Sequence, residues 1–244
     1  MELEIFEAHN GNCPYLAGRQ WYSYTFKAEK LDSMIYESLL AHGFRRSGQF
    51  FYKNNCPACS ECVAIRVLVQ EFKMSRSQKR TWNKNKDLAV VWHPVEYDDE
   101  SFDLYYRYSV QKHGTETSKK NYWDFLVNSA VETIMMRYYL GEKLVGVGWL
   151  DVLPRSLSSV YFAYDPDYSN RRLGIYSIMK EIELSKMMNR SFLHLGFWVK
   201  DCGTMNYKQQ FQPHELLIDD IWVDSQQGEV RSHPDPTPKI LRVF

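Results

Sequence analysis

Residues 171–176 read Arg-Arg-Leu-Gly-Ile-Tyr and lie between two segments of different pattern. The segment 158–164 before them is largely apolar and stops at Asp-Pro-Asp, which predicts a strand that ends there. The segment 174–188 after them has the apolar spacing of a helix. A helix that begins here has free backbone N–H groups beside two arginines, so the junction predicts a place where an anion docks.

The elements around this junction follow one another in a definite order. Residues 102–112 have helical spacing and are followed by Gly114. Residues 133–140 and 144–150 are apolar segments joined by Gly-Glu-Lys, which is a hairpin signal, and 192–199 predicts a strand after the helix. The order of helix, antiparallel meander, loop, helix and strand predicts an α+β fold with a mixed sheet flanked by helices.

This order resembles the GNAT acetyltransferase superfamily. In that superfamily the corresponding loop reads Arg/Gln-x-x-Gly-x-Gly/Ala and holds the pyrophosphate of coenzyme A. Arg171 and Gly174 match the pattern, whereas Tyr176 stands where the superfamily has a small residue. The resemblance implies a GNAT-like acyltransferase fold. Tyr176, however, argues against coenzyme A as the ligand of this loop.

The first part of the chain has a different organisation. Residues 31–42 predict a helix, and 49–52 and 65–69 predict short strands on either side of a cysteine cluster. The stretch 92–101 contains a proline and a run of acids, so we expect the seam between two halves there. The predicted divisions are a smaller N-terminal, cysteine-containing and basic α/β domain at 1–95, a GNAT-like catalytic domain at 96–225 and a tail at 226–244.

The composition excludes several classes of protein. The 244 residues include 30 Lys+Arg and 30 Asp+Glu, and 44% hydrophobic with 25% charged residues excludes a disordered or collagen-like chain. A formal charge of zero argues against nucleic-acid binding through gross charge, but it allows a local basic site. No apolar stretch approaches the roughly 20 residues of a membrane span, and the acidic start lacks a secretory signal. We therefore expect a cytoplasmic protein without a membrane partner.

The cysteines form the most specific local pattern. Their number, five, is odd, which argues against a disulfide framework and favours a reducing compartment. Cys56, Cys59 and Cys62 are three residues apart and match the first three positions of a ferredoxin-type run, with Cys13 as the candidate remote fourth ligand. An iron–sulfur cluster or a zinc ion is one interpretation. Reduced cysteines that shape a tight turn are the other.

Residues 73–86 form a basic segment in this neutral chain. They hold six positive side chains and no acid. Such a cluster attracts phosphates, and each phosphate contact adds a salt-dependent contribution to the affinity. A solvated helix face has the same pattern, so the segment alone does not decide between the two.

Residues 195–208 run from a strand into a polar loop. The loop holds Asp201, Tyr207 and Lys208, which can accept a proton, donate one and pair with a carboxylate, respectively. Structural roles in the core are the alternative for each of them.

These patterns occur in one order together with others. The motifs are Cys13-Pro14-Tyr15-Leu16, residues 56–62 followed by Ile65-Arg66-Val67, Ser-Arg-Ser-Gln-Lys-Arg at 75–80, Leu-Gly-Ile-Tyr-Ser at 173–177, and Leu-Gly-Phe at 195–197 with Asp201-Cys202, Met205 and Tyr207-Lys208. The set spans most of the chain and closely resembles the aminoacyl-tRNA–protein transferases, namely the arginyltransferases of eukaryotes and the shorter leucyltransferases of bacteria. The resemblance implies an enzyme of the N-degron (N-end rule) pathway, which moves an amino acid from its tRNA onto a protein whose N-terminus is Asp or Glu and so marks it for degradation.

The resemblance leaves the donated amino acid open. The motif at 173–177 is more similar to the eukaryotic arginyltransferases, whereas the chain length and the triple cysteine are more similar to the bacterial leucyltransferases. Leucyl-tRNA and arginyl-tRNA are therefore both candidate donors. Eukaryotic relatives have been associated with an iron–sulfur cluster, although their cysteine pattern differs from the one in this chain.

If the resemblance holds, the donor is already an activated ester and no cofactor is required. We expect Asp201 to act as the base or orienting group for the attacking α-amine, and Tyr207 to be a hydrogen-bond partner in the reaction. The acidic side chain of the acceptor requires a cation. The expected substrate-binding residues are Arg76, Asn206 and Lys208, and the residues expected to hold the phosphates of the tRNA acceptor stem are Lys79, Arg80, Lys84, Arg171 and Arg172.

Two other functions stay open at this point. A coenzyme A-dependent GNAT N-acetyltransferase would share the fold, although Tyr176 and the basic segment 73–86 argue against it. A non-catalytic, cysteine-cluster RNA-binding module would use the same cysteines and basic residues without turnover. The sequence does not indicate an oligomeric state.

Overall fold

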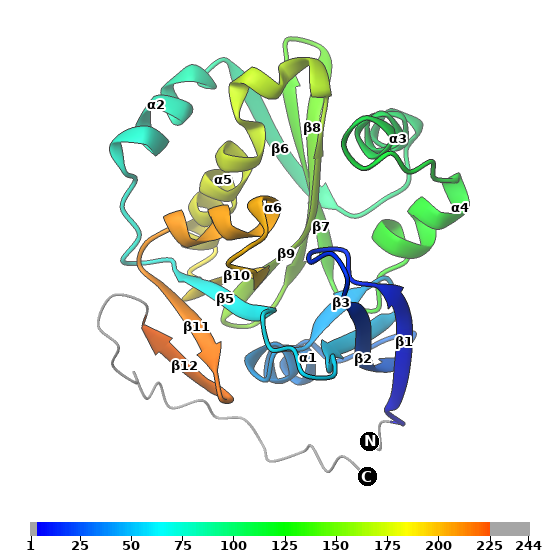
Figure 1. Ribbon diagram of the computed structural model, residues 1–244. Coiled ribbons are helices and arrows are strands. Elements are labelled where there is room, and N and C mark those ends of the chain that lie inside the picture. Colours follow the sequence, from blue (N-terminus) through cyan, green and yellow to red (C-terminus); the bar gives the residue numbers. More distant parts are fainter. Residues whose placement is uncertain (1–3, 225–244) are drawn as a thin grey trace.

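An eight-stranded mixed sheet runs through the computed structural model, which describes residues 4–224 (Figure 1). Its strand order is β12-β11-β5-β10-β9-β8-β7-β6. The pair β9–β10 is parallel, and all other neighbouring pairs of this sheet are antiparallel. The strands are β5 Val63–Leu68, β6 Leu88–Pro94, β7 Thr133–Leu140, β8 Lys143–Val152, β9 Ser156–Tyr164, β10 Phe192–Trp198, β11 His214–Ile218 and β12 Ile221–Asp224.

Helices cover both faces of this sheet. Helices α2 (Arg76–Lys84) and α5 (Leu173–Met187) lie on one face, and α3 (Asp99–His113) and α4 (Lys119–Tyr122) lie on the other (Figure 1). The central strand β8 is buried along nearly its whole length because it contributes side chains to the cores of both faces. Four short segments also belong to the large unit: the π-helix η1 (Trp123–Val127), the 3₁₀ helices η2 (Pro166–Arg171) and η3 (Tyr207–Gln210), and helix α6 (Gly203–Asn206).

A second, smaller sheet lies at one end of the molecule (Figure 1). Its four strands have the order β1-β2-β4-β3, and helix α1 packs on them through a core of its own. The elements are β1 Phe6–Asn12, β2 Gln20–Lys27, α1 Ser33–Ala41, β3 Arg45–Ser47 and β4 Phe50–Asn54.

The fold class expected from the sequence is confirmed. The order of helix α3, antiparallel meander β7-β8-β9, loop, helix α5 and strand β10 is the one predicted around residues 171–176, and β9 and β10 lie side by side in the mixed sheet. The predicted end of α3 is also confirmed, because Gly114 adopts the left-handed conformation (φ +63°) that ends helices.

The two-domain division at residue 95 stays a prediction, and the large sheet extends across it. Strand β5 precedes residue 95 in the sequence but lies between β11 and β10, near the middle of the large sheet, and β6 pairs with β7 at its edge. The expected tail at 226–244 lies outside the described residues. No helix among residues 4–224 is long and apolar enough to cross a membrane.

A buried ion pair joins the small sheet to the large one. Arg46 on β3 donates from Nη2 and Nε to the two carboxylate oxygens of Asp151 on β8, at 2.6 and 2.9 Å, and both side chains are fully buried. Its Nη1 donates to the carbonyl oxygen of Gly48, and the hydroxyl of Thr133 donates to Asp151. The polar groups of the pair are therefore hydrogen-bonded at both ends, as a buried charge requires.

The turn between β3 and β4 touches the large unit directly. Gly48 has φ +59°, and a Cβ at this position would overlap the carbonyl oxygen of Asp124 in η1. Its backbone N–H donates to the carbonyl oxygen of Phe125. Glycine is needed here both for the positive φ and for the close approach.

We expect Asp151→Ala to lower the free energy of unfolding by about 3–5 kcal/mol, because it leaves the Arg46 guanidinium buried without its partner. Urea unfolding followed by tryptophan fluorescence measures the change. The matched control is Lys53→Ala, which removes an exposed ion pair with Asp220 that also connects the two sheets and costs less than about 1 kcal/mol. Equal losses in the two variants would contradict a special role for the buried pair.

Candidate active site

Strands β9 and β10 separate part-way along their length. Their parallel pairing covers only the first residues, from Phe192 beside Ser156 to His194 beside Ser158. Beyond His194, β10 has an irregular register with β5 and contains Gly196 at φ +82°. The backbone groups of β9 beyond Ser158 therefore do not pair with β10 and can form hydrogen bonds with side chains.

Arg45 reaches into this divergence from β3. Its Nη2 donates to the carbonyl oxygen of Ser159 on β9 at 2.7 Å, and the guanidinium lies against Gly196 of β10, where a Cβ would be 3.5 Å from Nη2. The residue is buried, with 7% of its surface exposed. A buried cation thus lies between the two separating strands.

Lys208 brings a second amine to the same strand end. Its Nζ donates to the carbonyl oxygen of Phe197 at 2.8 Å and contacts the sulfur of Met205. Burial, and after it the positive charge of Arg45, lower the pKa of the Lys208 amine to about 7. The Lys208 amine therefore titrates near neutral pH. An anion bound beside it would favour its charged form.

Tyr207 and Glu181 add a hydroxyl and a carboxyl near this point. Burial raises the pKa of Tyr207, and the charge of Glu181 raises it further, so the phenol stays protonated. Glu181 projects from α5 with 1% of its surface exposed, and its Oε2 has no hydrogen-bond partner among the described residues. Burial raises the pKa of the Glu181 carboxyl to about 7, against a smaller lowering by a hydrogen bond with Ser159. A proton donor and a proton acceptor are therefore available together.

The other residues of the predicted catalytic loop lie nearer the surface. Asp201 is exposed on the turn after β10, and Asn206 donates to the carbonyl oxygen of Lys200 at 3.3 Å. Cys202 is buried with its sulfur 3.2 Å from the hydroxyl of Thr204. The structure thus brings Tyr207 and Lys208 to the divergence of the strands, with Asp201 on its outer side, and the roles of these residues stay predictions.

The basic residues expected to hold tRNA come together on one surface. Helix α2 begins with a capping box between Ser75 and Gln78, and it packs against the start of α5. Lys84 donates to the carbonyl oxygen of Asn170 at 2.8 Å, and Arg172 donates to the hydroxyl of Ser77 at 3.0 Å. The exposed cations of this surface are Arg76, Lys79, Arg80, Lys84 and Arg172.

Arg171 differs from its neighbours because its charge is already paired. Its guanidinium binds the carboxylate of Asp87 through two hydrogen bonds of 2.8 and 2.9 Å. The sequence alone does not reveal this contact, since the two residues are 84 positions apart. Arg171 therefore has less capacity to bind a phosphate than the exposed cations on α2.

Tyr176 does not lie over the start of α5. Its side chain is buried against the rings of Trp82 and Tyr138. A Cβ at Gly174 would meet no side chain or neighbouring backbone within 4 Å, and the N-cap residue Arg172 makes no side-chain capping bond. The helix start therefore stays accessible to an anion, which removes one of the two arguments against coenzyme A.

The four clustered cysteines gather at the end of the small sheet without forming a disulfide. Burial, and after it the neighbouring Cys13, Cys56 and Cys59, raise the pKa of the Cys62 thiol to about 12. Within residues 4–224, no three His, Cys, Asp or Glu side chains are arranged to hold a metal ion. The metal or cluster stays a prediction, and no step proposed below passes through one.

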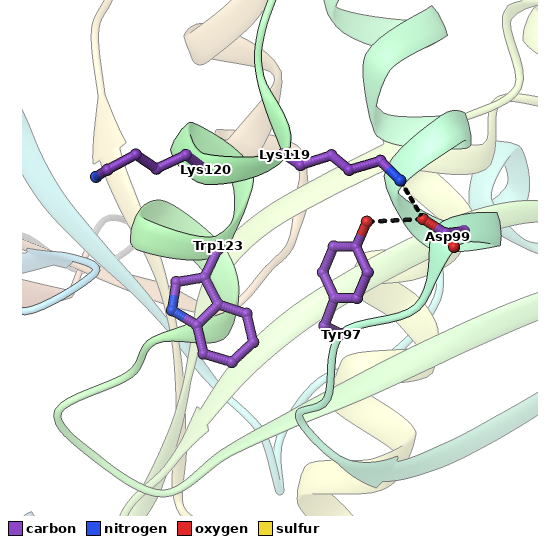
Figure 2. Close-up of a pocket in the computed structure, with 5 residues that line it drawn as sticks. All are labelled: Tyr97, Asp99, Lys119, Lys120 and Trp123. Carbon is purple, nitrogen blue, oxygen red and sulfur yellow. Dashed lines mark hydrogen bonds and ion pairs between the residues drawn. The ribbon is translucent and has the colours of Figure 1, made fainter.

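A surface pocket lies away from these residues, beside α3 and α4 (Figure 2). It is lined by Tyr97, Asp99, Lys119, Lys120 and Trp123. Lys119 and Tyr97 both donate to Asp99, at 2.6 and 2.7 Å, and Lys120 forms an ion pair with Asp124. Because its lysines are paired and none of the predicted site residues lines it, this pocket is not the candidate site.

Two residues at the divergence, Arg45 and Glu181, are not among the site residues predicted from the sequence. Arg45 belongs to a short Arg-Arg strand between Gly43 and Gly48. Two adjacent positive residues in a segment that passes through a core are the signal that the sequence offers for it. Glu181 lies at helical spacing from Ile178 and Ile182, so an acid on the apolar face of a helix is the corresponding signal. Neither pattern alone indicates which groups the side chain meets.

Comparison with known proteins gives two family matches and many relatives. The family described as arginine-tRNA-protein transferase, N terminus, matches residues 11–80, and arginine-tRNA-protein transferase, C terminus, matches residues 100–218. An aspartate/glutamate leucyltransferase of Pseudomonas aeruginosa is 34% identical over 226 residues, which cover 91% of this chain and 96% of the relative. One of Aeromonas hydrophila is 39% identical over 198 residues, which cover 79% and 82%.

Among solved structures, FemX aligns with 88% of this chain and 86% of its own, at 6% identity and a TM-score of 0.49. The two matched family regions together span nearly all of the site described above. The chain therefore belongs to the arginine-tRNA-protein transferase family and is an aminoacyltransferase that transfers from aminoacyl-tRNA to protein.

Proposed function

We propose that this enzyme transfers leucine from leucyl-tRNA to the α-amine of proteins whose N-terminal residue is Asp or Glu. The observation that supports leucine is the similarity, over most of their length, to bacterial enzymes named aspartate/glutamate leucyltransferase. The same reaction in the N-degron pathway marks the acceptor for degradation, and we place it in the cytoplasm. Arginyl-tRNA is the second candidate donor, because both matched family descriptions name arginine.

The proposed reaction is the aminolysis of an ester. The neutral α-amine of the acceptor attacks the carbonyl carbon of the aminoacyl ester, a C–N bond forms, and the C–O bond to the tRNA 3′-terminal ribose breaks. The amine loses a proton and the ribose oxygen gains one. Because the donor is an activated ester, the reaction requires no cofactor, and positioning alone can supply roughly 7–11 kcal/mol of the barrier reduction.

The groups at the β9–β10 divergence suit these proton transfers. Glu181 is the proposed acceptor of the proton from the attacking amine, since its Oε2 is buried without a partner. Tyr207 stays protonated and is the proposed donor to the developing oxyanion or the leaving oxygen. Asp201, exposed on the turn, is retained as an orienting group for the ammonium.

The exposed cations of α2 and the start of α5 suit the tRNA. Arg76, Lys79, Arg80, Lys84 and Arg172 lie on one surface, and phosphates are bound by such groups without sequence readout. Arg76, which was expected to bind the acceptor, lies on this surface at the start of α2, so we assign it to the tRNA.

The donor assay tests the function directly. The enzyme is incubated with leucyl-tRNA or arginyl-tRNA, each labelled in the amino acid, and with peptides that begin with Asp, Glu, Asn or Gln. We expect label to move from leucyl-tRNA to the Asp and Glu peptides only. Transfer from arginyl-tRNA alone would overturn the choice of leucine, and acetylation of a peptide from acetyl-coenzyme A without aminoacyl transfer would overturn the function.

We expect Lys79→Ala and Arg80→Ala each to weaken binding of leucyl-tRNA and to reduce the slope of log Kd against log salt by about 1, because each removes one phosphate contact. Filter binding between low and moderate salt measures both quantities. Lys120→Ala is the control, since Lys120 is exposed on the other face of the sheet. If the control and the α2 variants have the same slope as the unmodified enzyme, the α2 surface does not hold tRNA.

The carboxylate of Glu181 and the free α-amine are both needed for attack. With Glu181 near pKa 7 and the amine at about 7.7–8.0, we expect log kcat/KM to rise with a limiting slope of about 2 at acidic pH. Glu181→Gln should lower kcat about 10²–10⁴-fold and reduce that slope to about 1. Single-turnover transfer rates between pH 5.5 and 8.5 measure it.

Stability separates this effect from misfolding. Because the folded pKa of Glu181 is raised above the unfolded value, its contribution to stability is present at low pH and is lost as pH rises toward 7. Glu181→Gln should therefore be more stable than the unmodified enzyme at pH 8, by up to about 3 kcal/mol. If Glu181→Gln keeps a slope of 2, Glu181 is not the group that accepts the proton from the amine, and Asp201 becomes the proposed base.

A further inference from the structure

Arg45 is a buried cation that has no acidic partner in the part of the chain that the structure describes. Two other buried arginines in the described chain each face a carboxylate: Arg46 pairs with Asp151, and Arg66 pairs with Glu215. Arg45 forms no ion pair within residues 4–224, and one nitrogen, Nη2, donates to the Ser159 carbonyl oxygen. Burying a charge is unfavourable unless it is paired, so a guanidinium left in this state points to a ligand that supplies the anion.

A second positive group lies close enough to Arg45 to be affected by its charge. Lys208 binds the carbonyl oxygen of Phe197, the residue after the glycine against which Arg45 lies. The charge of Arg45 contributes to the lowered pKa of Lys208, which places both groups in one electrostatic environment. Two neighbouring cations repel each other, and one anion between them would relieve that repulsion.

The titratable neighbours do not supply this anion. Burial raises the pKa of the hydroxyls of Tyr15, Tyr36 and Tyr52, so they are neutral at pH 7. Burial also raises the pKa of the Cys62 thiol to about 12, so this neighbour of Lys208 is neutral as well. Burial, and after it the charges of Arg66 and Arg45, lower the pKa of His194, which keeps its imidazole uncharged. The Glu181 carboxyl is the remaining acid at this divergence; burial raises its pKa to about 7, and it forms no ion pair with Arg45 within the described residues. The charge of Arg45 is therefore not neutralised by an ion pair in this part of the chain.

We propose that Arg45 binds the side-chain carboxylate of the acceptor's N-terminal Asp or Glu, with Lys208 as its second cation. This proposal rests on the proposed function and assigns the residue that makes it selective. A guanidinium presents five N–H donors in a plane, so Arg45 can keep its bond to Ser159 and still offer other N–H groups to a carboxylate. The acceptor's α-amine would then lie beside Tyr207 and Glu181, on the same strand divergence.

The same arrangement explains rejection of the neutral amides. An N-terminal Asn or Gln has nearly the shape of Asp or Glu but leaves both cations without an anion. A site built around a buried polar partner discriminates strongly against an analogue that lacks it. We therefore expect kcat/KM for an Asp peptide to exceed that for the matching Asn peptide by at least about 30-fold.

The test compares variants of the full chain on two substrates separately. Arg45→Met should raise KM for the Asp peptide at least about 30-fold and reduce the Asp-over-Asn preference to a few-fold. Its Kd for leucyl-tRNA should stay within about twofold of that of the unmodified enzyme. Arg45→Lys keeps the charge and most of the volume but not the planar fork, so it should give an intermediate KM. Lys27→Met, an exposed cation on β2 of the same sheet, is the matched control.

Three results would overturn the proposal. One is an unchanged KM for the Asp peptide in Arg45→Lys. This result remains informative even if thermal unfolding shows that Arg45→Met is not folded. Another is a retained Asp-over-Asn preference in a folded Arg45→Met. The third is weakened tRNA binding with normal peptide KM, which would assign Arg45 to a tRNA phosphate instead. Failure of the unmodified enzyme to transfer any amino acid is a separate outcome that rejects the proposed function itself.

Discussion

The two arginines of β3 set the geometry on which the site depends. Successive side chains of a strand point to opposite sides, so Arg46 is directed to Asp151 while Arg45 is directed to Ser159 and Gly196. The buried Arg46–Asp151 pair fixes where β3 lies against the large sheet, and Arg45 is carried with it. A buried ion pair contributes little net stability compared with apolar residues, but it accepts only one arrangement of its partners. Here that arrangement places a second guanidinium between β9 and β10.

The neutral total charge of the chain conceals two positive regions with different environments. The surface of α2 and the start of α5 is exposed, so salt screens its cations and its affinity for phosphates is adjustable and reversible. Arg45 is buried and Lys208 is partly so, which makes their interaction with an anion stronger and more selective. The proposed function needs both kinds of site, because the tRNA is released at each turnover and the acceptor's Asp is distinguished from Asn. The acidic residues that balance the count, such as Glu96, Asp98 and Asp99, lie on other elements.

The element order from α3 to β10 can be predicted from the sequence because each element has its own period and its own end signal, such as Gly114 after α3. The small sheet could be predicted only in part, since β1 and β2 have mixed, half-exposed patterns. The position of β5 beside β10 depends on pairing between residues more than 100 positions apart, which leaves no local signal. The same holds for the site. Tyr207 and Lys208 belong to a motif that can be recognised in the sequence. Arg45 becomes a candidate only because it contacts Ser159, which is 114 positions away.

Helix α5 relates the two ends of the proposed reaction. Arg172 is the N-cap residue at its start, on the exposed basic surface, and Glu181 follows nine residues later on its buried face. This is a rise of about 13 Å along the helix axis at 1.5 Å per residue. A phosphate held at Arg172 is therefore well separated from the ester that reacts near Glu181. In the proposed reaction, the flexible, single-stranded 3′ end of the tRNA spans this distance. The proposal thus assigns the base-paired stem to the α2 surface and the unpaired 3′ end to the divergence of β9 and β10.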